Sequence, residues 1–163
     1  MSWATSDLGF SRRDFLIIQL FSILFFVAGI PISAVLADKF GRKKVLVLIS
    51  ILILLFGFTF SFFMDSGSSA MITTFVCIGM GLMGLTYGPL GTFLSELFPT
   101  EVRYSGASLT FNLAGILGAS FAPLIAIWLA KSYGIGYVGL YLSVAALISV
   151  LALLAIRKKE EEF

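Results

Sequence analysis

The stretch Ala37-Asp38-Lys39-Phe40-Gly41-Arg42-Lys43-Lys44 separates two long runs without any charged residue, 15–37 and 45–64. At about 1.5 Å per helical residue, each run is long enough to cross a hydrocarbon core of roughly 30 Å. Four of the residues from 39 to 44 are cations, and such a cluster is costly to move through lipid. The stretch therefore predicts a tight turn at a membrane surface, on the cytoplasmic side.

The composition also indicates a membrane protein. Apolar residues make up 59% of the chain and charged residues 12%, about half the charge of a soluble domain. The apolar runs are too long and too uniform for the alternating strands of a membrane barrel. We therefore expect an all-α fold, a polytopic helical membrane protein. The expected spans are Phe15–Ala37, Val45–Met64, Ala70–Ser95, Tyr104–Ala130 and Tyr133–Ile156.

The basic residues predict the orientation of these spans. If the 38–44 turn is cytoplasmic, eight of the 11 lysines and arginines lie on that side, and Arg12, Arg13 and Lys131 lie on the other. Those eight are Lys39, Arg42, Lys43, Lys44, Arg103, Arg157, Lys158 and Lys159. The positive-inside rule then places the N-terminus outside, the C-terminus in the cytoplasm and residues 65–69 in an outer turn. We expect the membrane to be the plasma (inner) membrane.

Several kinds of chemistry are disfavoured by what the chain contains. There is no histidine, and the single cysteine, Cys77, lies inside an apolar run. A nucleophile such as Ser108 has no neighbouring base, so we expect no enzyme activity, no metal and no cofactor. The net charge of +2 sits at the span ends, which does not indicate a nucleic-acid partner.

Glycines dominate the third expected span. Gly79, Gly81, Gly84, Gly88 and Gly91 allow close approach of neighbouring helices, and the proline after Gly88 predicts a bend. The spelling G-x-G-x-x-G at 79–84 lacks the strand and the βαβ unit of a dinucleotide site, so helix packing explains it better. The pattern indicates a moving or cavity-lining helix.

The fourth expected span has one small and polar face. Ser108, Asn112, Gly115 and Ala119 recur at helical spacing, opposite bulky apolar residues. We expect this face to contact protein or water.

Glu96 lies at the cytoplasmic end of the third span. A bare carboxylate is costly at the mouth of an apolar helix, so a cation is expected nearby, with Arg103 or Arg42 as candidates. The alternative is a solvated interfacial charge.

Two stretches carry a resemblance to a known family. Residues 34–43 resemble the G-x-L-A-D-[RK]-x-G-R-[KR] signature of the major facilitator superfamily, with Ala34 in place of the first glycine. Residues 87–108 are similar to its metabolite:proton symporter branch, which moves organic acids, shikimate-like compounds or zwitterionic osmolytes. The resemblance implies that 1–163 is an incomplete C-terminal half, with helices eight to twelve as its five spans. The implied partners are the N-terminal half, the lipid bilayer, a small-molecule substrate and protons.

The resemblance also implies roles for individual residues. Asp38, Gly41, Arg42, Glu96 and Arg103 would form a cytoplasmic latch that holds the two halves together in the outward-open state. The candidate cavity and substrate residues would be Gln19, Tyr87, Gly88, Pro89 and Asn112. The alternative for the polar members of this second set is hydrogen bonding between helices.

No residue suited to proton coupling lies inside the expected spans. A proton symporter needs a titratable group inside the membrane, and no aspartate, glutamate, lysine or arginine lies in the interior of the five spans. We therefore expect the fragment alone to be inactive and the longer parent to transport by alternating access. The alternative is a structural half-molecule that packs against a separately encoded N-terminal half.

Overall fold

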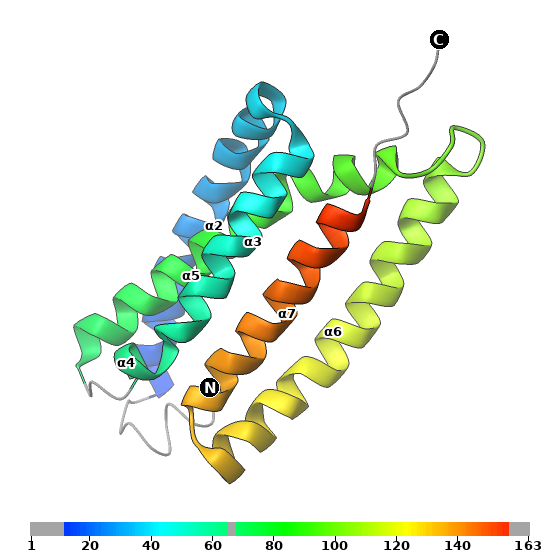
Figure 1. Cartoon of the computed structure of the whole chain (residues 1–163). Coiled ribbons are helices and arrows are strands. Elements are labelled where there is room, and N and C mark those ends of the chain that lie inside the picture. The colour runs from blue at the N-terminus through cyan, green and yellow to red at the C-terminus, as the bar shows by residue number, and fades with distance from the viewer. Residues whose placement is uncertain (1–11, 65–67, 157–163) are drawn as a thin grey trace.

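The computed structural model describes residues 12–64 and 68–156, where the chain is helical and has no strand. The helices run alternately up and down, so that their ends gather at two levels (Figure 1). This arrangement confirms the expected all-α membrane fold. The expected outer turn falls partly outside the described residues, at 65–67, and so do the basic residues 157–159. The helices are α2 (Arg12–Phe40), α3 (Arg42–Phe58), α4 (Phe60–Met64), α5 (Ser69–Glu96), α6 (Arg103–Tyr133) and α7 (Gly136–Ala155).

Helices α2 and α5 form the most extensive helix pair. Glycines on both helices allow their backbones to touch: a Cβ added at Gly29 would lie 2.9 Å from the carbonyl oxygen of Gly81, and one added at Gly84 would run into the backbone of Phe26. Small residues at a helix interface are the usual way to bring membrane helices this close. The expected close approach of the glycine-rich span is therefore confirmed.

Helices α3 and α7 form a second, antiparallel pair. Gly57 near the end of α3 faces Gly139 near the start of α7, and the Ser143 hydroxyl donates a 2.9 Å hydrogen bond to the Leu54 carbonyl oxygen. Helix α3 also contacts α5, so it lies between the α2–α5 pair and α7. The described helices thus build one continuous bundle.

The stretch expected as one span over 45–64 is two helices, α3 and α4, separated at Thr59. The Thr59 backbone N–H and its hydroxyl both donate to the Phe56 carbonyl oxygen, at 3.1 and 2.8 Å, which tightens the last turn of α3. With 17 residues, α3 spans about 25 Å, less than a hydrocarbon core. Four stretches in the described residues are long and apolar enough to cross a membrane by themselves: Leu16–Phe40, Ser69–Glu96, Arg103–Tyr133 and Gly136–Ala155.

Helix α6 differs from the others because none of its residues is buried. It contacts α7 and α5 only at part of its surface, and Figure 1 shows it at the edge of the bundle beside α7. The small and polar residues of its expected face, from Ser108 to Ala119, are exposed, and a Cβ added at Gly115 would meet no atom within 4 Å. In this chain the face has no protein partner among the described residues.

An aromatic group marks the turn between α6 and α7. The ring of Tyr133 lies 5.5 Å from that of Trp128 and 5.4 Å from that of Tyr137, measured between centroids, and all three side chains are exposed. Lys131 lies between them in sequence. Exposed tryptophan and tyrosine beside a cation are typical of the membrane–water interface, and this turn lies at the level opposite to the α2–α3 turn (Figure 1).

Candidate functional site

The turn between α2 and α3 consists of one residue outside the helices, Gly41. Its φ of 94° and ψ of 131° form a conformation that residues with a Cβ rarely adopt. The Gly41 N–H donates to the Ala37 carbonyl oxygen at 2.9 Å, and its own carbonyl accepts from Val45 N–H at 3.2 Å. The expected tight turn is confirmed, and it sets Asp38 and Arg42 on either side of one glycine.

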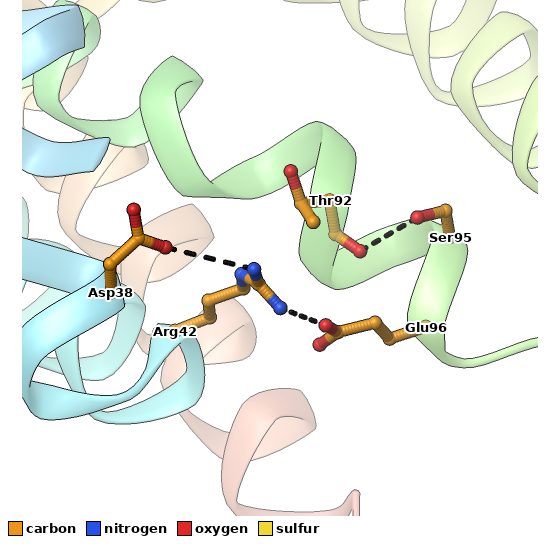
Figure 2. A network of polar contacts seen from close by, with 5 residues as sticks. All are labelled: Asp38, Arg42, Thr92, Ser95 and Glu96. Atoms are coloured by element: carbon orange, nitrogen blue, oxygen red, sulfur yellow. Dashed lines mark hydrogen bonds and ion pairs between the residues drawn. The ribbon is translucent and has the colours of Figure 1, made fainter. Parts of the chain in front are cut away.

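Arg42 bridges two carboxylates from different helices. Its Nη2 lies 3.7 Å from Asp38 Oδ1 at the end of α2, and its Nη1 donates to Glu96 Oε1 at the end of α5. Figure 2 shows the guanidinium between the two acidic side chains. The side chains of Arg42 and Glu96 are 33% and 42% exposed, so solvent weakens the attraction without abolishing it. Of the two cations expected beside Glu96, the structure therefore selects Arg42.

Arg103 does not join this network, contrary to the expectation. Among the described residues it pairs with no carboxylate; its Nε donates a 3.4 Å hydrogen bond to the Phe98 carbonyl oxygen. The loop before α6 supplies this partner instead. The Phe98 ring packs against Gly106, within 3 Å of where a Cβ would be, so Arg103 bonds to the same loop residue that packs on its own helix.

Lys43 makes a contact that the sequence did not indicate. Its Nζ donates to the carbonyl oxygen of Ile156 at 2.6 Å and lies 3.5 Å from that of Leu154, at the end of α7. A signal was present, because Arg42 and Lys43 occupy the first turn of α3, where the helix dipole disfavours cations. Cations in such a place indicate partners elsewhere in the structure.

The three candidate cavity residues on α5 fall into two environments. Gly88 packs against α2, where an added Cβ would lie 2.5 Å from the Ile30 carbonyl oxygen, and Pro89 is fully buried. Neither lines an open space in this chain. Tyr87 is half exposed, and its ring meets the edge of the Phe26 ring at 5.6 Å. Pro89 leaves the Leu85 carbonyl without its helical donor, and the last part of α5 departs from the direction of the first (Figure 1).

Gln19 and Asn112 do not converge on one site. Gln19 lies in the first third of α2 and Asn112 in the first third of α6, and these two helices start at opposite levels of the bundle (Figure 1). Both residues are exposed. The Asn112 amide donates to the Ser108 carbonyl oxygen at 2.8 Å, so it is bonded within its own helix. The candidate cavity residues thus do not enclose a pocket by themselves.

The polar groups inside the bundle are small and paired. Ser22 is fully buried between α2 and α5; it donates to the Ile18 carbonyl oxygen at 2.7 Å and lies 3.4 Å from Cys77 Sγ. Every buried side-chain nitrogen or oxygen in the described residues has a hydrogen-bond partner. Within the same residues, no three histidine, cysteine, aspartate or glutamate side chains lie close enough together to hold a metal ion.

Comparison with known families matches the whole chain, residues 1–163, to the Major Facilitator Superfamily. The chain belongs to the major facilitator superfamily. In this superfamily member, Asp38, Gly41 and Arg42 of the 34–43 stretch form the turn, and Arg42 extends the contact to Glu96 on α5.

Curated relatives of this superfamily chain are transport proteins. It is 48% identical over 152 residues to Inner membrane metabolite transport protein YhjE of Escherichia coli (strain K12), covering 93% of the chain and 34% of that protein. It is 28% identical to the Shikimate transporter of the same organism, covering 98% and 37%. With the Citrate-proton symporter of Klebsiella pneumoniae the identity is also 28%, covering 87% and 32%. No solved structure matches the chain.

The chain spans about a third of the length of these relatives.

Proposed function

We propose that this chain is the C-terminal portion of an inner-membrane transporter for a small metabolite. The metabolite is an organic acid, a shikimate-like compound or a zwitterionic osmolyte. The longer protein works by proton-coupled symport with alternating access. The names of the relatives, which include a shikimate transporter and a citrate-proton symporter, support this substrate range. The chain is not an enzyme under this proposal.

The observation that carries the proposal is the bridge made by Arg42. It connects the α2–α3 turn to the end of α5 through Asp38 and Glu96. These contacts are exposed enough to break and re-form, because an exposed ion pair is worth about 1 kcal/mol or less. Such a network suits a latch that closes in one state of a transporter and opens in the other. Asp38, 73% exposed, remains accessible to a partner from the other half.

The proposed orientation places the α2–α3 turn in the cytoplasm and the Trp128–Tyr133–Tyr137 group at the outer surface. Because Cys77 is the only cysteine and is buried, a Cys77→Ser background allows single cysteines at Lys44 and Lys131 to be labelled in intact cells. A membrane-impermeant maleimide should label position 131 and spare position 44. The reverse pattern would contradict the orientation.

The transport proposal is tested with a chimera. In YhjE, the Escherichia coli relative that is 48% identical to it, this chain replaces the segment that it matches. Uptake of labelled shikimate, citrate and glycine betaine is then measured with and without a protonophore. We expect uptake of the compounds that the native relative takes up, abolished by the protonophore. A chimera that inserts normally but transports none of them would overturn the assignment. Purified 1–163 in liposomes should give no uptake above empty vesicles, since no charged residue lies in the interior of the five expected spans.

A second candidate is a half-molecule that pairs with a separately encoded N-terminal half. The exposed small and polar face of α6, without a buried residue along its length, favours it. This candidate is tested by co-expressing two polypeptides, this chain and the part of YhjE that it does not match. Co-purification and recovered uptake would support a split transporter, whereas separate chains that do not associate would argue against it.

A further inference from the structure

The C-terminal end of α7 is held by a side chain from the first turn of α3. Lys43 Nζ lies 2.6 Å from the Ile156 carbonyl oxygen and 3.5 Å from that of Leu154. The last carbonyl groups of a helix have no partner within the helix, and they carry the negative end of its dipole. An ammonium placed on them therefore satisfies acceptors and neutralises partial charge in a single contact.

Lys43 occupies a position in α3 that is unfavourable for a cation unless it has a partner outside this helix. Arg42 and Lys43 occupy the first two positions of α3, and its first turn has no acidic residue. Cations at a helix N-terminus oppose the dipole of that helix. Partners for these cations therefore come from outside α3, and the structure provides them at the ends of α2, α5 and α7.

The two neighbouring cations divide these partners between them. Arg42 binds the Glu96 carboxylate at the end of α5, whereas Lys43 binds backbone carbonyl groups at the end of α7. At the other end of the α3–α7 pair, Gly57 packs on Gly139. Helix α7 is thus fixed to α3 at both ends, by close packing at one and by the lysine at the other.

We propose that Lys43 is a positioning residue that caps α7 and fixes its C-terminal end to the α2–α3 turn, independently of the Arg42–Glu96 ion pair. The first turn of α3 then joins the ends of α5 and α7 through two separate contacts. A movement of this turn carries both helix ends with it. The inference rests on the contacts of this chain and not on the proposed transport function.

Hydrogen exchange of the full chain in lipid nanodiscs tests the cap. In Lys43→Ala, the backbone amides of residues 153–156, at the C-terminal end of α7 and its cap, should exchange about three- to tenfold faster than in the unchanged chain, because the helix end loses the lysine contact. Lys43→Arg should restore slow exchange, since it keeps a charged donor. Lys44→Ala is the matched control: it removes a neighbouring, exposed cation and should leave these amides unchanged.

Arg42→Ala separates the two contacts. It should accelerate exchange at the end of α5, in residues 93–97, and leave 153–156 unaffected. Equal acceleration at both ends in both variants, or an effect of Lys44→Ala as large as that of Lys43→Ala, would overturn the independent cap.

A measurement on the unchanged protein supports the variants. An amine-acetylating reagent should modify Lys43 more slowly than Lys44, and equal rates would contradict the contact.

Discussion

At the residue scale, the proposed latch is a single guanidinium shared by two carboxylates. Asp38 lies four residues before Arg42, across the Gly41 turn, while Glu96 is 54 residues away. The local contact is long, at 3.7 Å, whereas the contact to Glu96 is a direct hydrogen bond. We therefore expect the Arg42–Glu96 pair to contribute more to the stability of the bundle than the Arg42–Asp38 pair.

A double-mutant cycle should measure this energy. We expect Arg42→Ala and Glu96→Ala each to lower the melting temperature of the purified chain in detergent slightly, and the double variant to lose little more than either one. The coupling should be about 0.2–1 kcal/mol, because both side chains are partly exposed.

Glu101→Ala is the matched control, because Glu101 is exposed and forms no ion pair in the described part of the chain. Combined with Arg42→Ala, it should give simple additivity. A coupling between Arg42 and Glu101 as large as that between Arg42 and Glu96 would show that the cycle reports net charge and not this ion pair.

The sequence predicted which residues gather at this turn better than it predicted their contacts. The cation cluster between two charge-free runs indicated a tight turn, and Glu96 indicated a cationic partner. The choice between Arg42 and Arg103 depended on the direction of the 97–102 loop, which no spacing encodes. The role of Lys43 depended on where α7 ends in space.

At the scale of elements, the α2–α5 pair depends on glycines at specific positions. A Cβ at Gly84 would run into the backbone of Phe26, whereas a Cβ at Gly91, on the same helix, would meet no atom within 4 Å. Helix packing therefore requires glycine at position 84 and not at position 91, although the sequence pattern does not distinguish the two.

The contrast predicts opposite effects of one substitution. Gly84→Ala should destabilise the chain by about 1–3 kcal/mol, because the helices must move apart. Gly91→Ala should be neutral or stabilise by up to about 1 kcal/mol, because alanine favours the helix. Thermal unfolding of both variants in the same detergent provides the measurement, and equal destabilisation would contradict the packing described for α2 and α5.

Charge-free runs predicted the helices well because length and hydropathy are what a bilayer selects. Helix α4 escaped prediction because the break at Thr59 comes from a local hydrogen bond to Phe56, which leaves the hydropathy unchanged. Tyr133 ends α6 and does not begin the last span, a boundary that aromatic residues at the interface leave undefined in the sequence.

At the scale of the whole molecule, one face of the chain has no described neighbour. The candidate cavity residues do not converge, and α6 buries no residue. Both observations follow if the site of the proposed longer transporter needs helices outside this chain, whose contacts this sequence does not encode.

Substitutions on α6 test whether a longer transporter covers this face. In the chimera with the Escherichia coli relative, Gly115→Trp should lower uptake at least several-fold by obstructing close packing of helices. Leu117→Trp, on the opposite and bulky face, should have little effect. In the chain alone neither change should alter the melting temperature, since both positions are exposed. Equal loss of uptake in both variants would argue against a covered small-residue face.

The length of α6 has a consequence for the host membrane. Arg103 and Lys131, near its two ends, are 28 positions apart, which corresponds to about 42 Å along a helix axis. A bilayer measures about 40–45 Å with its headgroup layers, so an upright α6 places one cation among the lipid phosphates of each leaflet. In a thinner bilayer α6 must tilt to keep both cations at the headgroups, so a change of membrane thickness should alter the tilt of this helix at the edge of the bundle first.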